Sequence, residues 1–301
     1  MNSTSAIRLA GMLATGILTA YTPCSSAIEG LTIVPQIAFQ HKNLDFSQSF
    51  KGGENADVKG SFEATLPTLD LAITTLYQKA YLSIKYDTSF GNNFTYADNG
   101  FTKANSEIER NDFSVTLGYD VWKALHVFGG YMKGNTKITP DAKYIDYPGA
   151  QQNNEQCVDT APCFPTVISN PAQDHELRNL SPYQQKYTES GYFLGASYGL
   201  PIKQKGTLSF SLAYALMDGE YTDNYLAGTD TPRTFRYKGD SKGYSLGLTW
   251  SAALTRKSGY FFDLRRQNYD MDADDKTGLF GGNAETEETM TTATVGMQMY
   301  F

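Results

Sequence analysis

The chain has 301 residues, of which 25 are Lys or Arg and 32 are Asp or Glu, so its formal net charge is −7 at pH 7. This acidic balance argues against a nucleic-acid partner, because binding to phosphates needs a basic face. Apolar residues make up 41% of the chain and charged residues 19%, a composition that excludes intrinsic disorder. Tyr (21), Phe (17) and Gly (27) are abundant, which favours strands over helices.

Residues 1–27 predict an export signal. One charged residue, Arg8, precedes an uncharged run whose centre, 9–18, is apolar, and the small residues 25–27 (Ser-Ser-Ala) follow. A basic residue, an apolar run and a small-residue cleavage site are typical of a secretory signal peptide. We therefore expect cleavage after Ala27 and a mature domain that comprises residues 28–301.

The cysteines are interpreted together with this signal. Attachment of a lipid at Cys24 is the alternative to cleavage after Ala27, but residues 21–23 are not the small residues that such a site resembles. Cys157 and Cys163 remain in the mature chain, and two cysteines in an exported protein predict one disulfide. We expect this disulfide to staple a surface loop rather than to serve redox chemistry.

The uncharged windows of the mature chain have the size of strands. A membrane helix needs about 20 apolar residues, whereas a tilted membrane strand needs about 9 to 11. The longest uncharged window, 160–173, is interrupted by prolines, and shorter ones such as 206–217 and 243–255 alternate between large apolar and small residues. The expected strands lie near 31–41, 60–77, 80–90, 108–120, 124–137, 187–200, 206–217, 235–254, 259–270 and 288–301.

The connections alternate between tight and long. The tight ones are 78–79, 121–123, 201–205 and 255–258; the long, polar ones are 42–59, 91–107, 138–186, 218–234 and 271–287. An even number of antiparallel strands with short turns on one side is the arrangement of bacterial outer-membrane barrels. Aromatic residues gather beside the tight turns, where an interfacial girdle would lie: Tyr77, Tyr81, Tyr119, Trp122, Tyr198, Trp250, Tyr260 and Phe261. The sequence therefore predicts an all-β, antiparallel transmembrane β-barrel of about ten strands.

The last eight residues, 294–301, bring in a family resemblance. Thr294, Gly296, Met299 and Phe301 have the spacing of the C-terminal assembly signal of Gram-negative outer-membrane β-barrel proteins, which this segment resembles. The resemblance implies a location in the cell outer membrane, contact with its lipid and lipopolysaccharide, and insertion by the outer-membrane assembly machinery. It implies nothing about activity.

If the large apolar residues face lipid, the charged residues of the same strands face the lumen, because Arg or Lys facing lipid at mid-depth costs about 2 to 4 kcal/mol. Both signs of charge are present, which predicts a network of ion pairs that fills a narrow lumen. The alternative is a narrow channel or ligand pocket lined by the same charges. The residues assigned to this network are Asp70, Lys85, Asp87, Arg110, Asp112, Glu189, Asp263 and Arg265.

Candidates for catalysis are few. The histidines are His41, His126 and His175, and Asp174 with His175 is the only adjacent Asp-His pair. Ten-stranded barrels include the omptin proteases, which use an Asp-His pair at the outer rim. Adjacent residues on an extended chain point apart, however, and no surrounding omptin motif is present, so no catalytic role is transferred.

No metal or cofactor site is predicted. The run 270–275 places carboxylates at the first, third and fifth positions of a calcium loop, but it lacks the required Gly and the closing Glu. Weak binding of a divalent ion by this acidic segment is the minority alternative. No nucleotide-binding or zinc motif is present either.

These observations lead to an expected function. We expect the protein not to be an enzyme and to have a structural or surface-interaction role carried by its extracellular loops, because loops on a rigid scaffold commonly carry binding functions. A narrow pore or small-ligand transporter is the alternative, and a surface hydrolase is the second alternative. The surface partner is not identified by the sequence.

Overall fold

The computed structural model describes residues 30–52, 56–91, 94–98, 103–122, 124–140, 184–202, 205–225, 233–275 and 282–301. They form β1 (Leu31–Gly52), β2 (Ala56–Tyr77), β3 (Ala80–Ser89), β4 (Phe94–Asp98), β5 (Lys103–Trp122), β6 (Leu125–Pro140), β7 (Gln184–Ile202), β8 (Gly206–Tyr225), β9 (Arg233–Ala253), β10 (Ser258–Asp275) and β11 (Gly282–Met299). Within these ranges no helix is long and apolar enough to cross a membrane.

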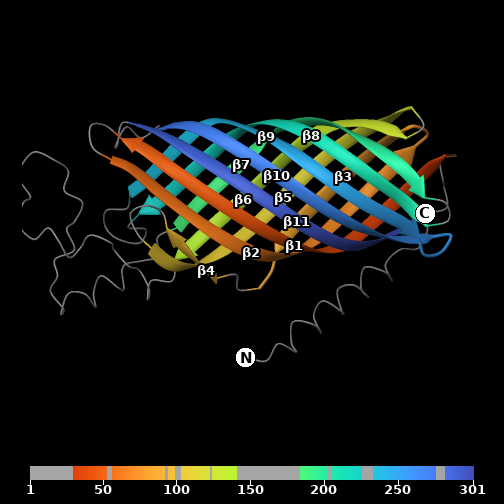
Figure 1. Cartoon of the computed structure of the whole chain (residues 1–301), viewed down its shortest axis with the longest axis horizontal. Coiled ribbons are helices and arrows are strands. Elements are labelled where there is room, and N and C mark those ends of the chain that lie inside the picture. The colour runs from red at the N-terminus through yellow and green to blue at the C-terminus, as the bar shows by residue number, and fades with distance from the viewer. Residues whose placement is uncertain are drawn as a thin grey trace, which may run out of the picture.

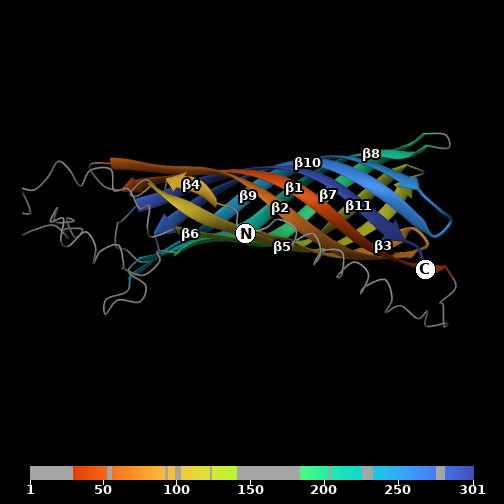
Figure 2. The same ribbon diagram turned by 90° about the horizontal axis from the view of Figure 1, so that it is seen from below.

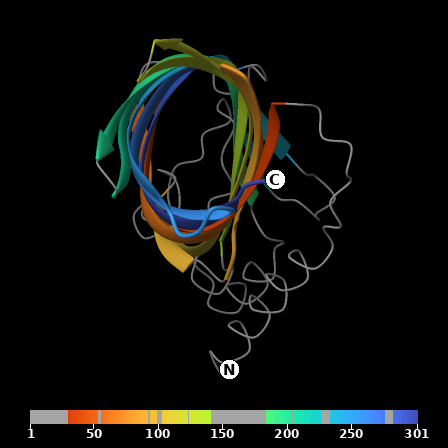
Figure 3. The ribbon, with the colours of Figure 1, turned by 90° about the vertical axis from the view of Figure 1, so that its right-hand side faces the viewer.

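The strands form one antiparallel sheet that closes on itself. The first strand, β1, pairs with both β2 and β11, so the two ends of the sheet meet. Figure 1 shows the tilted strands from the side, and Figure 3 shows the closed ring from one end. The short strands β3 and β4 pair in turn with the same neighbour, β5, and together take the place of one strand. The predicted ten-stranded barrel is therefore confirmed.

Large apolar side chains cover the outer surface nearest the tight turns. They alternate with smaller inward-facing residues, as the pattern of 206–217 predicts. An outward apolar band is the surface that an outer-membrane barrel presents to lipid. Its exposed members include Phe39, Leu71, Ile73, Leu82, Ile84, Phe113, Leu117, Leu194, Phe210, Leu212, Tyr214, Leu216, Leu246, Phe262, Leu264, Val295 and Met297. The chain thus has the fold and the outward apolar band of an outer-membrane β-barrel, as expected.

The strands are longer than the sequence predicted. Most of the segments expected as the long loops 42–59, 218–234 and 271–287 continue the neighbouring strands, and part of 91–107 is strand as well. The reason is a reversal of the alternation beyond the apolar band. In β10, Phe262 and Leu264 are exposed to the outside, whereas further along the strand Met271 and Ala273 are buried inside. In these segments the outward residues are polar and the inward residues are apolar. They therefore lack the outward apolar residues by which the sequence predicts a membrane strand.

The tight turns gather at one end of the barrel, which Figures 1 and 2 show on the same side as the C-terminus. Short turns mark the periplasmic end of such barrels. Tyr77, Tyr119, Trp122, Tyr198 and Trp250 are exposed there, as a girdle requires. The assignment of Tyr81 and Phe261 to the girdle is wrong. Their rings point inward and lie over glycines of the neighbouring strands.

Candidate functional site

The lumen contains a chain of ion pairs at the level of the outer part of the apolar band. Lys42 of β1 lies 2.5 Å from Asp87 and 2.7 Å from Asp112. Lys85 lies 2.9 Å from Asp70, whose carboxylate also accepts a hydrogen bond from Gln40. Lys85 also lies 3.6 Å from Asp87, so these contacts join six residues of neighbouring strands into one group. Lys42 was not among the predicted lumen residues, because it lies in a segment expected to be a loop.

A second group of contacts crosses the lumen from β5 to β11. The guanidinium of Arg110 lies 3.0 Å from Asp112 through Nε and 2.7 Å from Glu288 through Nη1. Glu288 is completely buried, and its other carboxylate oxygen has no hydrogen-bond partner. Arg110 and Glu288 come from strands that are not neighbours, so no local sequence pattern indicates their pairing.

The other three predicted lumen residues lie outside this group. Glu189 accepts hydrogen bonds from the hydroxyls of Tyr187 and Ser241, at 2.5 and 2.6 Å. Asp263 accepts one from Thr249 and lies 3.4 Å from Arg265. The structure thus divides the eight predicted charges among one extended network and two local clusters.

An apolar layer fills the lumen beyond the charges, toward the end where the long connections lie. Phe46 of β1 stacks on Phe62 of β2, with ring centroids 5.1 Å apart, and contacts Tyr187 of β7 edge-on at 5.2 Å. Five steps separate β1 from β7 in either direction around the ring, with β3 and β4 taken as one strand. The contact therefore spans the full width of the barrel. The layer comprises Leu44, Phe46, Phe62, Ala64, Leu66, Ala97, Ile108, Ile138, Tyr187, Tyr221, Tyr237, Met271, Ala273, Ala284 and Met290.

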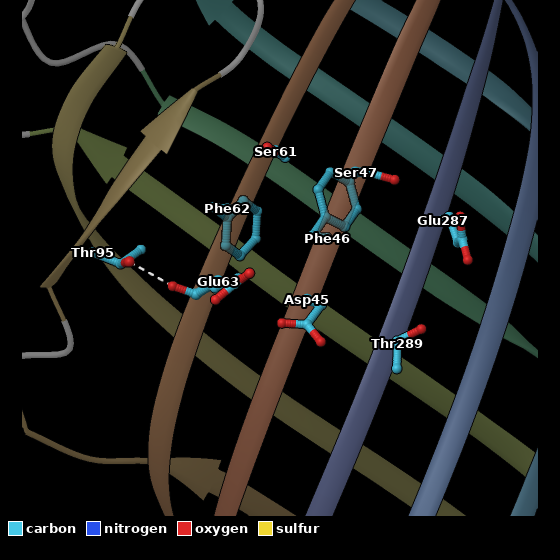
Figure 4. A pocket seen from close by; sticks show the side chains of 9 residues that line it. All are labelled: Asp45, Phe46, Ser47, Ser61, Phe62, Glu63, Thr95, Glu287 and Thr289. Carbon is cyan, nitrogen blue, oxygen red and sulfur yellow. Dashed lines mark hydrogen bonds between the residues drawn. The ribbon is translucent and has the colours of Figure 1, made fainter.

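A cavity of about 630 Å³ lies in the wall of the projecting part of the barrel, over β1, β2, β4 and β11. Figure 4 shows the side chains of Asp45 and Glu63 next to one another on adjacent strands, with Glu287 nearby on β11. In the described part of the chain no Lys or Arg forms an ion pair with these three carboxylates. The cavity is lined by Asp45, Phe46, Ser47, Ser61, Phe62, Glu63, Thr95, Glu287 and Thr289.

Acidic residues continue from this cavity across the outer surface. Asp270 lies opposite Glu287, Asp272 lies opposite both Asp240 and Glu285, and Asp240 lies opposite Asp218. Like charges directly opposite one another on neighbouring strands repel. Above the apolar band, the outer surface of β8 to β11 therefore carries closely spaced carboxylates, with Lys242 opposite Asp270. We call these residues, together with the cavity, the acidic wall.

At the far edge of the acidic wall, Glu220 is neutralised by cations. Lys238 lies 2.9 Å from its carboxylate, and Arg236 lies 3.1 Å away. The hydrogen bond from Lys238 lowers the pKa of Glu220, and the positive charges of Lys238 and Arg236 add to this effect. Glu220 thus differs from Asp45, Glu63 and Glu287, because two cations balance its charge.

The segment that resembles an assembly signal forms the closing strand. Thr294 and Gly296 face inward, and a side chain at Gly296 would collide with the ring of Phe261. The backbone of Phe301 exchanges two hydrogen bonds with Ile33 of β1, and its side chain is exposed. Recognition of Thr294, Gly296, Met299 and Phe301 by the assembly machinery stays a prediction.

Several predictions concern residues outside the described ranges. They are the signal peptide 1–27, the disulfide between Cys157 and Cys163, and the pair Asp174 and His175. The acidic run 270–275, in contrast, lies within the described ranges and forms the end of β10. Its alternate carboxylates therefore point outward from a strand and are not arranged around a loop.

No protein-family model matches the chain, and no curated protein matches it in sequence. Solved structures do match. The outer membrane protease OmpT from Escherichia coli has a TM-score of 0.66 at 13% identity, over 92% of this chain and 99% of that chain. The translocator domain of the autotransporter NalP from Neisseria meningitidis has a TM-score of 0.41 at 13% identity, over 99% of this chain and 98% of that chain.

The match with OmpT corrects one expectation. We expected the protein not to be an enzyme, because its sequence contains no catalytic motif. However, the similar barrel of OmpT is that of a protease. The exclusion is therefore wrong. At 13% identity the likeness shows the shared fold, and function has to be argued from this chain's own sites.

Proposed function

We propose that the protein is a closed barrel that acts as a surface-interaction platform, with binding carried by the wall and connections that project beyond the membrane. The observation that carries this proposal is the contact of Phe46 with Tyr187 across the full width of the lumen. Below it, the pair of Arg110 with Glu288 crosses the same lumen. A solute would have to displace both layers, which argues against the alternative of a narrow pore.

The acidic wall suggests the charge of the partner. Asp45, Glu63 and Glu287 line a cavity large enough for a flexible side chain, and Ser and Thr hydroxyls supply further acceptors. Carboxylates without cationic partners attract positively charged groups, and the attraction falls with salt concentration. A lysine- or arginine-rich protein segment fits this surface.

The lumen is tested by electrical recording in planar bilayers. We expect no steady conductance from the wild-type barrel, because the apolar and charged layers leave no continuous water path. Removal of both rings, in Phe46→Ala with Tyr187→Ala, should still give no steady conductance, because the pair of Arg110 with Glu288 crosses the lumen as well. Steady steps from the wild type that change in size in Arg110→Gln would refute the closed barrel and support the pore.

The partner is tested with a fluorescent pentalysine peptide and the barrel in nanodiscs. We expect salt-sensitive binding that is weakened in the triple variant Asp45→Asn, Glu63→Gln, Glu287→Gln. The control is Glu109→Gln, which removes an exposed carboxylate of β5 that does not line the cavity. Equal affinities of the two variants would contradict a binding role for the wall.

A further inference from the structure

The tight turn between β5 and β6 brings an Asp-His pair together at the periplasmic end of the lumen. Asp120 and His126 lie opposite one another on the two strands, and Oδ1 of Asp120 is hydrogen-bonded to Nδ1 of His126. Both side chains are on the inward face, since their neighbours Tyr119 and Val127 are exposed to the outside. A register shift between Asp120 and Trp122 marks a β-bulge, a feature that re-aims side chains and is frequent beside active sites.

A serine lies on the other side of the histidine. His126 is opposite Ser197 of β7, so Asp120, His126 and Ser197 form one row across three adjacent strands. Side chains directly opposite one another have Cβ atoms about 4.5 to 5.5 Å apart. Because Nδ1 of His126 is bonded to Asp120, Nε2 is the ring nitrogen left for a partner, and Ser197 is the residue opposite His126 on its other neighbouring strand. This is the order of acid, base and nucleophile in a serine-hydrolase triad.

Water reaches this row. The side chains of Asp120 and His126 point inward and yet remain 45% and 33% exposed. Side chains of the apolar layer at the other end are almost completely buried. The lumen is therefore accessible from the periplasmic end, into which Figure 3 looks, and closed at the opposite end.

The row continues to a positive charge. Ser197 lies opposite Ser211, and Ser211 lies opposite Gly247. Gly247 has no side chain, and the guanidinium of Arg265 occupies the space next to it: a Cβ at Gly247 would lie 2.4 Å from Ser211 Oγ and 3.5 Å from Arg265 Nη2. Arg265 thus gives this row of the lumen a positive charge, three strands from Ser197.

We propose that Asp120, His126 and Ser197 form a triad that hydrolyses small carboxylic esters entering the lumen from the periplasm. Ser197 Oγ attacks the ester carbonyl carbon while its proton passes to Nε2 of His126. The bond from the carbonyl carbon to the alcohol oxygen then breaks, and the alcohol leaves with that proton. Water repeats the sequence on the acyl-serine: its proton goes to His126, its oxygen bonds to the acyl carbon, and the acid leaves as Ser197 regains a proton. Asp120 is a positioning residue that holds the imidazole.

The test is reaction of the folded full-length mature barrel in detergent with a fluorophosphonate, which modifies activated serines, followed by peptide mapping. We expect one adduct, on Ser197, and hydrolysis of p-nitrophenyl acetate at a rate that follows the labelling. Ser197→Ala should abolish both, and His126→Asn should lower both at least about 100-fold, the usual contribution of a general base. Ser209→Ala is the matched control, because Ser209 is inward-facing on β8 one row nearer the periplasm.

The role of Asp120 is separated from a structural one by rescue. Asp120→Asn keeps the size of the side chain and should lower the labelling rate, whereas Asp120→Glu keeps the carboxylate and should restore part of it. Heat-modifiable migration in gels verifies that each variant is folded. The proposal is overturned if the folded wild type takes no adduct, if the adduct forms on another residue, or if the rate does not depend on His126.

Discussion

At the residue scale, burial decides how much each charge of the lumen matters for stability. Arg110 and Glu288 are 3% and 0% exposed, whereas Lys137 and Glu109 form an ion pair with side chains that are 38% and 50% exposed. An exposed pair contributes about 0 to 1 kcal/mol. Removal of one partner from a buried pair leaves an uncompensated charge, which costs about 3 to 5 kcal/mol.

Glu288→Leu should therefore lower the free energy of unfolding by about 3 kcal/mol or more, because Arg110 loses the carboxylate on β11. Urea unfolding of the refolded barrel in detergent measures this. Glu109→Leu, which opens the exposed pair with Lys137, should change stability by less than about 1 kcal/mol. The double variant Arg110→Leu with Glu288→Leu should recover much of the loss. Equal effects of the two single variants would show that the lumen pair is not buried as described.

The ion pair of Glu220 predicts a pH dependence. Its pKa is lowered by the hydrogen bond from Lys238 and by the charges of Lys238 and Arg236. A carboxyl whose pKa is lower in the folded state stabilises the fold above its unfolded pKa, and this contribution disappears as the pH falls through the folded value. The stability difference between wild type and Lys238→Gln should thus be present at neutral pH and vanish in acid below the glutamate range. A difference that is constant with pH would contradict the pairing.

Residue identity alone could not predict these partners. Asp70, Lys85, Asp87, Arg110 and Asp112 were assigned to the lumen from the alternation of their strands, and the structure places their side chains in contact there. Glu288 and Lys42 were missed since they lie where the apolar alternation ends. The pairing of Asp120 with His126 was not predicted, because the two residues are six positions apart in the sequence. The tight turn between β5 and β6 places them opposite one another.

At the scale of strands, inward aromatic rings lie over glycines of the neighbouring strand. A Cβ at Gly118 would lie 2.1 Å from a ring atom of Tyr81, and one at Gly243 would lie 2.0 Å from the ring of Tyr269. Glycine is needed at these positions for space rather than for backbone conformation, because neither has a positive φ. The pairs fix the register between strands from the inside of the barrel.

Gly243→Ala should destabilise the barrel by about 1 to 3 kcal/mol, the usual cost of overpacking, because the ring of Tyr269 is buried and cannot yield. Gly199→Ala is the matched control. Its added Cβ would have its nearest contact at 3.4 Å, with Thr207, which is ordinary van der Waals contact. Urea unfolding compares the two variants. Similar losses at both positions would argue against a role for the ring of Tyr269.

The closing strand carries the prediction about assembly. Deletion of Phe301 removes the residue whose backbone exchanges two hydrogen bonds with Ile33 of β1, and an unclosed edge cannot be satisfied in lipid. We expect loss of heat-modifiable barrel from the outer membrane. Val295→Ala, which trims an exposed residue within β11, should assemble normally. Normal amounts of folded protein without Phe301 would contradict the assembly signal.

At the scale of the whole molecule, the barrel is longer than the membrane is thick. β10 contains 18 residues; at about 3.3 Å per residue and a tilt of about 40°, it rises about 45 Å, against an apolar band about 25 Å tall. The sequence predicted the part within the membrane well, since lipid imposes one sign of alternation. It could not predict the projecting part, because there water surrounds the barrel and the apolar layer lies inside. The residues still alternate with a period of two, but the apolar ones face inward.

Environment-sensitive labels provide the last test, because the reversal predicts two surroundings on one face of β10. In a background without Cys157 and Cys163, a bimane label on Leu264→Cys should fluoresce as in lipid and resist aqueous quenchers, since Leu264 belongs to the exposed apolar band. The same label on Asp272→Cys, eight positions along the outward face, should be quenched from the water. A label on Ala273→Cys faces the interior layer, where Ala273 is 3% exposed, and should be protected from both quenchers in lipid and quenchers in water. Lipid-like fluorescence at position 272 would mean that the membrane covers the acidic wall, and the surface-interaction platform would then have to be confined to the connections.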